Sequence, residues 1–243
     1  MTYLMTIDSG NTHVKWGLHD GSNWLEQGTI TQDKSILLQQ EWKSLPTPHG
    51  IIISNVSSIE TKKKLSEFLS CWKVKPRWIT PLVYQCGVRN YYADPSLLGS
   101  DRWAALIAAW NWQKKGCLVV DVGTAMTVDA LSDTGEFLGG IIVPGFKLMK
   151  ESLTTNITTL QNQEGEFSEF PNNTANAIHS GTVHALVGTV KRMSELFSST
   201  LGHAPMCIIS GGASQQLMSE LNMDASVVDN LVLEGLVLIA EEN

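Results

Sequence analysis

The stretch that decides the fold is residues 8–12, Asp-Ser-Gly-Asn-Thr, which returns in related form at residues 121–125 as Asp-Val-Gly-Thr-Ala. Each copy follows a short apolar run and precedes another, residues 14–19 in the first copy and 126–131 in the second. Turn residues and a third strand-like run then follow in both copies. Strand, Asp-x-Gly turn, strand, turn and strand are thus written twice, which predicts two related halves.

The segments between and after the two copies alternate between helical and extended patterns. Helices are expected over residues 35–44, 59–72, 101–115, 146–159, 174–201, 213–221 and 231–242, and further strands over 51–55, 74–79 and 206–210. This alternation predicts an α/β architecture in which each half is a mixed sheet flanked by helices. We place the boundary near Gly116, so the expected domains are residues 1–115 and 116–243.

Charge and composition exclude several classes of protein. The 243 residues carry a formal net charge of -7, which argues against a chain that binds nucleic acid or an anionic membrane through bulk charge. No apolar stretch approaches the roughly 18 residues of a membrane span, and the N-terminus lacks the features of a secretory signal. The four cysteines show no Cys-x-x-Cys spacing. His179 and His184, five residues apart, do not share the helix face that metal ligands would need. Reduced thiols in a cytoplasmic setting are therefore expected.

Each Asp-x-Gly turn has the chemistry of a phosphate site. Glycine lets the backbone bend tightly beside a ligand, and successive N–H groups can form a nest for an anion. Asp8 cannot hold phosphate directly because like charges repel, but it can orient Mg²⁺, which takes one or two carboxylates and keeps several waters. Lys15 follows closely enough to supply a cation to a β- or γ-phosphate. The alternative is an ordinary hairpin with an Asx-type turn, and the duplication favours the ligand site.

Two further motifs belong to the same pattern. Asp121, Gly123 and Thr124 repeat the device in the second half, and two facing turns would enclose a polyphosphate. Residues 210–212, Ser-Gly-Gly, close a predicted strand and precede a helix. Glycines at such a position suit a structural turn as well as a ligand loop, so both interpretations stay open here.

Residues 101 and 102 carry a candidate base and a candidate carboxylate ligand. Asp101 stands where a helix is expected to begin, and the N-terminal N–H groups and dipole of a helix favour an ionised carboxylate. A carboxylate near a substrate hydroxyl can accept its proton during in-line phosphoryl transfer. Arg102 offers a planar fork that suits a carboxylate. The alternative is a capping Asp followed by a surface Arg.

In their order along the chain, these motifs resemble those of the type III pantothenate kinases, within the actin-like ATPase superfamily. The matching segments are residues 8–12, 92–102, 121–125, 139–145, 173–178, 181–182 and 210–212. The most specific are Gly-x-Asp-Arg at 99–102 and Asp-x-Gly-Thr-Ala at 121–125. The resemblance implies two ribonuclease H-like domains. It also implies transfer of the ATP γ-phosphoryl group to the primary hydroxyl of pantothenate, the first step towards coenzyme A.

The resemblance further implies roles for individual residues. Asp101 would be the catalytic base, and Asp121 would help bind a monovalent cation (K⁺ or NH₄⁺). Asp8 would bind Mg²⁺ or orient a water molecule bound to it. ATP would be bound by Asp8, Ser9, Gly10, Asn11, Thr12, His13, Val14, Lys15 and Thr124. Pantothenate would be bound by Tyr92, Gly99, Ser100, Asp101, Arg102 and Thr182.

Members of this family are homodimers with the substrate pocket near the interface, so Thr182 would act on the neighbouring subunit's site. Two other hypotheses stay open on the sequence. One is a related kinase that acts on a different small hydroxy acid or sugar. The other is a catalytically silent regulatory protein, against which stand the acidic net charge and the retained aspartates.

Overall fold

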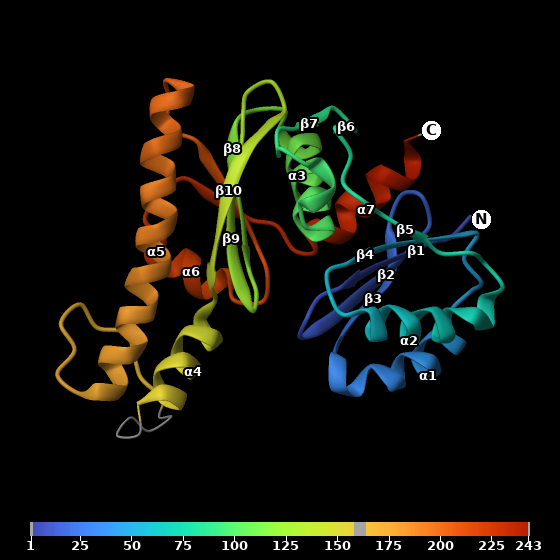
Figure 1. Ribbon diagram of the computed structural model, residues 1–243, viewed down its shortest axis with the longest axis horizontal. Helices are drawn as coiled ribbons and strands as arrows, with labels where there is room; N and C mark the ends of the chain where they lie inside the picture. Colours follow the sequence, from blue (N-terminus) through green and yellow to red (C-terminus); the bar gives the residue numbers. More distant parts are fainter. Residues whose placement is uncertain (1, 158–163, 243) are drawn as a thin grey trace. The chain divides into compact units, whose positions relative to one another are not determined.

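The computed structural model describes residues 2–157 and 164–242. Over these residues the chain divides into two compact units, each with its own sheet and helices (Figure 1). The first unit is Met1–Gln113 together with Asn230–Asn243, and the second is Lys114–Asp229. The expected fold class, α/β with mixed sheets flanked by helices, is confirmed. The closing helix, which the sequence placed in residues 116–243, groups instead with the first unit.

The first unit is built on a sheet with the strand order β3-β2-β1-β4-β5. Its strands are β1 (Leu4–Ser9), β2 (His13–His19), β3 (Trp24–Thr31), β4 (Gly50–Asn55) and β5 (Arg77–Trp78). β1 is antiparallel to β2 and parallel to β4. Side chains alternate along β1, so that the fully buried Met5 and Ile7 face one core and Asp8 faces the opposite side of the sheet.

Helices lie on both faces of this sheet. They are η1 (Gln32–Leu37), α1 (Leu38–Lys43), α2 (Ile59–Leu69), η2 (Ser70–Trp72), η3 (Pro95–Leu97), α3 (Ser100–Gln113) and α7 (Leu231–Glu241). α1 and α2 pack on the face of Met5 and Ile7, around the fully buried Trp42. α7 and α3 lie side by side on the opposite face (Figure 1). Gly235 permits their close approach, because a Cβ at that position would overlap the carbonyl oxygen of Ala104.

The second unit contains strands in the order β12-β11-β8-β9-β10. These are β8 (Cys117–Val122), β9 (Ala125–Leu131), β10 (Glu136–Pro144), β11 (Met206–Ser210) and β12 (Ala225–Val227). Three helices, α4 (Phe146–Asn156), α5 (Thr174–Leu201) and α6 (Ser214–Leu221), pack on the face that carries Val120 and Val122. α5 is preceded by the N-cap Asn173, whose side chain accepts the Asn176 N–H at 2.9 Å, and is followed by the C-cap Gly202 with φ 79°.

Most predicted elements are confirmed, and the differences are short. The helix expected over 146–159 ends at Asn156, and residues 158–159 lie outside the described residues. The strand expected over 74–79 is reduced to β5. The antiparallel pair β6 (Tyr84–Gln85) and β7 (Val88–Asn90) was not predicted, because so few residues show no periodicity. In the described part of the chain, no helix is both long and apolar enough to cross a membrane.

Candidate functional site

The first Asp-x-Gly turn joins β1 to β2 and is closed by a hydrogen bond from the Gly10 N–H to the His13 carbonyl at 3.0 Å. Asp8 pairs in register with Lys15 on β2, so the carboxylate and the ammonium group share one face of the sheet. Asn11 and His13 are exposed at the turn. Val14 is fully buried in the core, so only its backbone is available for the ATP contact that the sequence predicted.

Gln32, which the sequence did not single out, holds this turn in place through two hydrogen bonds. Its Nε2 donates to the Gly10 carbonyl at 2.7 Å, and its backbone N–H donates to the Thr12 carbonyl at 2.9 Å. Ser9, expected to contact ATP, is fully buried, and its Oγ shares a hydrogen bond with the Ser57 Oγ at 3.1 Å. The Ser9 side chain therefore holds the loop in place, as Gln32 does.

Asp101 lies at the start of α3, close to the end of β1. Asp8 pairs in register with Ser54 of the parallel strand β4, whose Oγ is 3.0 Å from the Ser100 Oγ. The Ser100 Oγ also accepts the Asn55 N–H at 3.1 Å. These bonds fasten the N-terminus of α3 to the same sheet edge and face as Asp8. Ser100 is 6% exposed, so its side chain anchors the helix rather than facing a ligand.

The carboxylate of Asp101 is held in a defined orientation and is partly desolvated. Its Oδ1 accepts the Arg102 N–H at 2.8 Å. Gly99 makes room for it, because a Cβ at residue 99 would overlap this oxygen. Burial raises the pKa of Asp101 above its ordinary value of 3.8, and the Arg102 N–H and guanidinium charge oppose that rise. A raised pKa makes a carboxylate a stronger base, as proton abstraction requires.

Arg102 and Tyr92 form a second polar group beside Asp101. Arg102 Nη1 donates to the Tyr92 hydroxyl at 3.0 Å, and the guanidinium carbon lies 5.7 Å from the centre of the Tyr92 ring. Arg102 is 7% exposed, so its charge is largely screened from water. The Tyr92 N–H donates to Asn90 Oδ1 at 3.0 Å, which fixes the segment that leads to α3. The structure thus places Tyr92, Asp101 and Arg102 together.

The second Asp-x-Gly turn, between β8 and β9, is enclosed by close backbone contacts. The Gly145 N–H donates to the Thr124 carbonyl at 2.9 Å, and a Cβ at residue 145 would overlap the Gly123 carbonyl. Gly211 has φ 97°, and a Cβ there would lie 2.6 Å from the Val122 N and O atoms. Of the two interpretations of Ser-Gly-Gly, this contact supports a structural turn. Thr124 is exposed, so its hydroxyl is accessible to a ligand.

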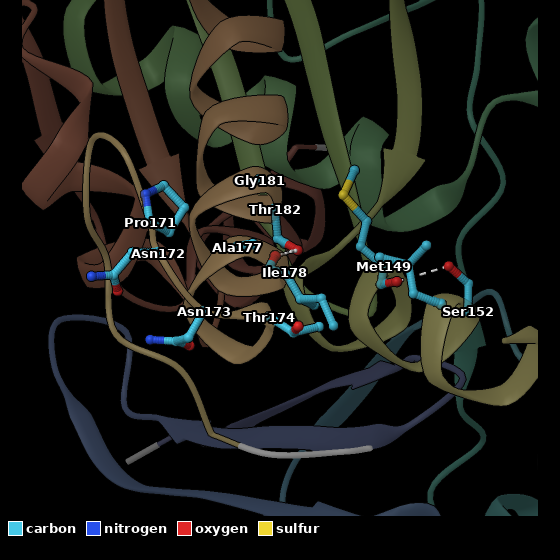
Figure 2. A pocket seen from close by; sticks show the side chains of 11 residues that line it. Met149, Ser152, Pro171, Asn172, Asn173, Thr174, Ala177, Ile178, Gly181 and Thr182 are labelled. Carbon is cyan, nitrogen blue, oxygen red and sulfur yellow. Dashed lines mark hydrogen bonds between the residues drawn. The ribbon is translucent and has the colours of Figure 1, made fainter. Parts of the chain in front are cut away.

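Thr182, on α5 of the second unit, borders a cavity of about 780 Å³ beside α4 (Figure 2). The cavity is lined by Met149, Ser152, Leu153, Pro171, Asn172, Asn173, Thr174, Ala177, Ile178, Gly181 and Thr182. The Thr182 Oγ1 donates to the Ile178 carbonyl at 2.9 Å. One turn along α5, His179 Nδ1 accepts a hydrogen bond from Lys150 of α4 at 2.9 Å. Burial and the charge of Lys150 lower the pKa of His179.

Among the described residues, no group of three or more His, Cys, Asp or Glu side chains could by itself hold a metal ion. Asp8 and Asp121 each stand at the end of a strand, next to an Asp-x-Gly turn. Single carboxylates of this kind fit Mg²⁺ that arrives with a nucleotide, because such an ion takes its remaining ligands from phosphate and water. A cation of lower charge likewise fits one carboxylate together with phosphate oxygens.

Comparison with known proteins gives one consistent family. The family model of type III pantothenate kinase matches residues 4–196. A type III pantothenate kinase of Nitrosospira multiformis is 56% identical over 239 residues, which cover 98% of this chain and 91% of that protein. One from Nitrosomonas eutropha is 48% identical and covers 99% of this chain and 95% of its own. A solved Sinorhizobium meliloti protein, provisionally described as a 2-dehydro-3-deoxygalactonokinase, shares the fold with TM-score 0.64, 14% identity and 98% coverage of both chains.

Proposed function

This chain belongs to the type III pantothenate kinase family, and we propose that it transfers the γ-phosphoryl group of ATP to the primary hydroxyl of pantothenate. The product is 4'-phosphopantothenate, and the step is the first in coenzyme A synthesis. The observation that carries this proposal is the arrangement at the start of α3. There a carboxylate with a raised pKa lies next to a buried guanidinium group, at the sheet edge that holds the first Asp-x-Gly turn.

Asp101 acts as the general base. Its carboxylate accepts the proton of the pantothenate hydroxyl while the hydroxyl oxygen forms a bond to the γ-phosphorus. The bond from that phosphorus to the oxygen shared with the β-phosphate breaks, and ADP leaves with the bonding electrons. The hydrogen bond from the Arg102 N–H holds Asp101 in place, so little reorganisation is needed at the moment of transfer.

Arg102 and Tyr92 recognise the carboxylate of pantothenate. One N–H of the Arg102 guanidinium group donates to the Tyr92 hydroxyl, and the planar fork of the group suits a carboxylate acceptor. Gly99 contributes by leaving space at the carboxylate of Asp101. Ser100 serves this site as an anchor of α3, through Ser54 and the Asn55 N–H. Thr182 contributes from the wall of the cavity in Figure 2.

The first turn binds the phosphates of ATP through backbone N–H groups of the turn other than that of Gly10, which is bonded to the His13 carbonyl, together with the exposed side chains of Asn11 and His13 and the Lys15 ammonium group. In the second unit, Thr124 supplies a further contact to ATP. Asp8 holds Mg²⁺, directly or through water, and Asp121 helps to hold a monovalent cation, K⁺ or NH₄⁺. These cations neutralise phosphate charge when bound.

We further propose a cytoplasmic homodimer. The dimer is supported by apolar side chains that α4 and its surroundings leave exposed in the second unit, among them Ile142 (61%), Leu148 (41%), Ile157 (42%) and Phe170 (89%). Large apolar side chains that stay exposed are typical of an interaction surface. The cytoplasmic location is supported by the four cysteines, which are all thiols.

The proposal is tested by measuring ADP release with ATP, Mg²⁺ and pantothenate in K⁺, NH₄⁺ or Na⁺ buffer. We expect turnover that depends on pantothenate and that K⁺ or NH₄⁺ stimulates. Pantothenol, which keeps the primary hydroxyl but lacks the carboxylate, is the matched control and should show a higher KM. Equal use of pantothenol would contradict the role of Arg102. Absence of turnover with every cation would contradict the function. Light scattering on a sizing column should show twice the chain mass, and a monomer would contradict the dimer.

A further inference from the structure

The first unit has a cavity of its own, of about 400 Å³, at the edge of its sheet that lies away from Asp8. Its lining includes Leu4 and Gly50, which begin the parallel strands β1 and β4, whereas Asp8 and Ser54 stand near the ends of those strands. Leu4 and Asp8 are four positions apart on an extended strand, or roughly 13 Å. The cavity is therefore distinct from the phosphate turn.

This cavity is lined in part by a histidine that is mostly buried and whose ring Nε2 is a candidate hydrogen-bond donor. His19, at the end of β2, is 8% exposed, and its ring contacts Trp24 edge to face at 4.9 Å between centroids. Its Nδ1 accepts the Gly21 N–H at 3.2 Å, so Nε2 carries the proton of the neutral ring. Within residues 2–157 and 164–242, Nε2 has no hydrogen-bond partner. Because the Nε2 atom is not closed off from solvent, it can donate to a molecule in the cavity.

Two basic side chains line the same cavity. Arg77 of β5 donates from Nη1 to the Ile239 carbonyl at 3.2 Å, which fixes the guanidinium group at the end of α7 and leaves its other donors available. Lys75 lies two residues earlier. Neither cation forms an ion pair with a carboxylate among the described residues, although Glu241 lines the cavity as well. Two positive charges against one negative charge make this region cationic, in a chain whose net charge is -7.

A second histidine, His49, also lines the cavity. The Nδ1 N–H of His49 donates a hydrogen bond to the Tyr3 carbonyl. This bond fixes the orientation of the imidazole ring. His19, Lys75 and Arg77 thus line one cavity. A guanidinium fork, an ammonium group and an imidazole N–H are the groups that proteins use to bind phosphate and carboxylate oxygens.

We propose that this cavity is a binding site for a small organic oxyanion, a phosphate ester or a carboxylate, separate from the kinase site. The cavity volume lies at the lower end of the roughly 300–1,000 Å³ of small-molecule pockets, which suits a metabolite of modest size. Binding at this site requires no catalysis, so it can succeed or fail independently of the pantothenate kinase activity.

The test is a titration of the full chain with inorganic phosphate or citrate, followed in ¹H–¹⁵N correlation spectra. A non-hydrolysable ATP analogue with Mg²⁺ is present throughout, so that the phosphate turn is already filled. We expect saturable shifts at His19, Gly21 and Gly50, with a Kd of about 1 mM. Whichever probe binds more tightly identifies the oxyanion, phosphate or carboxylate.

Variants separate specific binding from general attraction. Lys75→Gln with Arg77→Gln should weaken binding about a hundredfold, because each charge-assisted contact accounts for about tenfold. Lys63→Gln, on the exposed face of α2, removes a similar charge elsewhere and should leave Kd unchanged. Lys75→Gln alone, at an exposed position, keeps the test valid if the double variant fails to fold. Absence of saturable shifts at the cavity with both probes, or equal weakening by Lys63→Gln, would overturn the proposal.

Discussion

Gly211 and Gly212 offer a sharp test of how the second Asp-x-Gly turn is built. Gly211 has φ 97°, and an added Cβ would lie 2.6 Å from the Val122 N and O atoms, against the 3.4 Å at which ordinary contact begins. Gly211→Ala therefore asks an alanine to adopt a left-handed backbone and asks Val122 to move by about 0.8 Å, the difference between these distances. Gly212 carries neither constraint, because no atom of the described residues lies within 4 Å of a Cβ at that position.

The expected cost can be estimated from these two effects. A non-glycine residue at positive φ costs about 1–2 kcal/mol, and forcing a group into a packed site costs about 1–3 kcal/mol. Gly211→Ala should therefore lower the free energy of unfolding of the second unit by about 2–5 kcal/mol, a large share of a typical total of about 5–15 kcal/mol. Because Val122 lies between Asp121 and Gly123, the same displacement should raise the KM for ATP.

The assay is urea denaturation followed by circular dichroism, together with ATP kinetics at saturating pantothenate. Gly212→Ala should change the free energy of unfolding by less than about 0.5 kcal/mol, as surface substitutions usually do. If Gly211→Ala and Gly212→Ala behave alike in stability and in KM, Gly211 is not the close contact described above. An unfolded Gly211→Ala protein beside a folded Gly212→Ala protein would agree with the prediction.

Four further predictions concern the two Asp-x-Gly turns and the start of α3. Gln32→Ala should raise the KM for ATP about two- to tenfold, because it removes the brace on Gly10, while the pantothenate KM stays constant. Arg102→Lys keeps the charge but loses the planar fork, so it should raise the KM for pantothenate and leave that for pantothenol unchanged. Asp121→Asn should abolish stimulation by K⁺ in initial-rate assays. Burial raises the folded-state pKa of Asp101 above its unfolded value, so its stabilising contribution is complete below the unfolded pKa and is lost as the pH rises through the folded pKa. Asp101→Asn should therefore melt at a higher temperature than the wild type at pH 7, with the difference shrinking below about pH 4.

The duplicated Asp-x-Gly pattern predicted two related halves, and the alternation of helices and strands predicted the α/β class. Each copy places a strand, a tight turn and a second strand in order, and hydrophobic periodicity predicted the longer helices. β6 and β7 escaped prediction because two or three residues show no period. The C-terminal helix was assigned to the second half by its position in the chain. Its place beside α3 depends on a close contact between Gly235 and Ala104, which no local pattern reveals.

Part of the candidate site could be predicted from sequence motifs, and part of it depends on contacts between distant residues. Turn glycines and the pair Asp101 and Arg102 carry a chemical signature that can be read locally. The roles of Gln32, Ser57 and Ser54 depend on hydrogen bonds between residues 22 to 48 positions apart, so a local pattern does not show them. Ser9, Val14 and Ser100 lie within the motifs, yet burial turns their side chains toward the protein interior. A motif thus marks where a ligand loop lies, and packing decides which of its side chains can reach the ligand.

The central claim is that Asp101 is the base in phosphoryl transfer to pantothenate. The most direct measurement compares kcat for pantothenate-dependent ADP formation in the wild type, Asp101→Asn and Asp94→Asn. Asp94 is an exposed aspartate that caps η3 seven positions upstream, so it controls for the loss of one carboxylate near the site. We predict that Asp101→Asn folds and loses about 10²–10⁴-fold in kcat, whereas Asp94→Asn stays close to the wild type. An Asp101→Asn enzyme with near wild-type kcat would contradict the account.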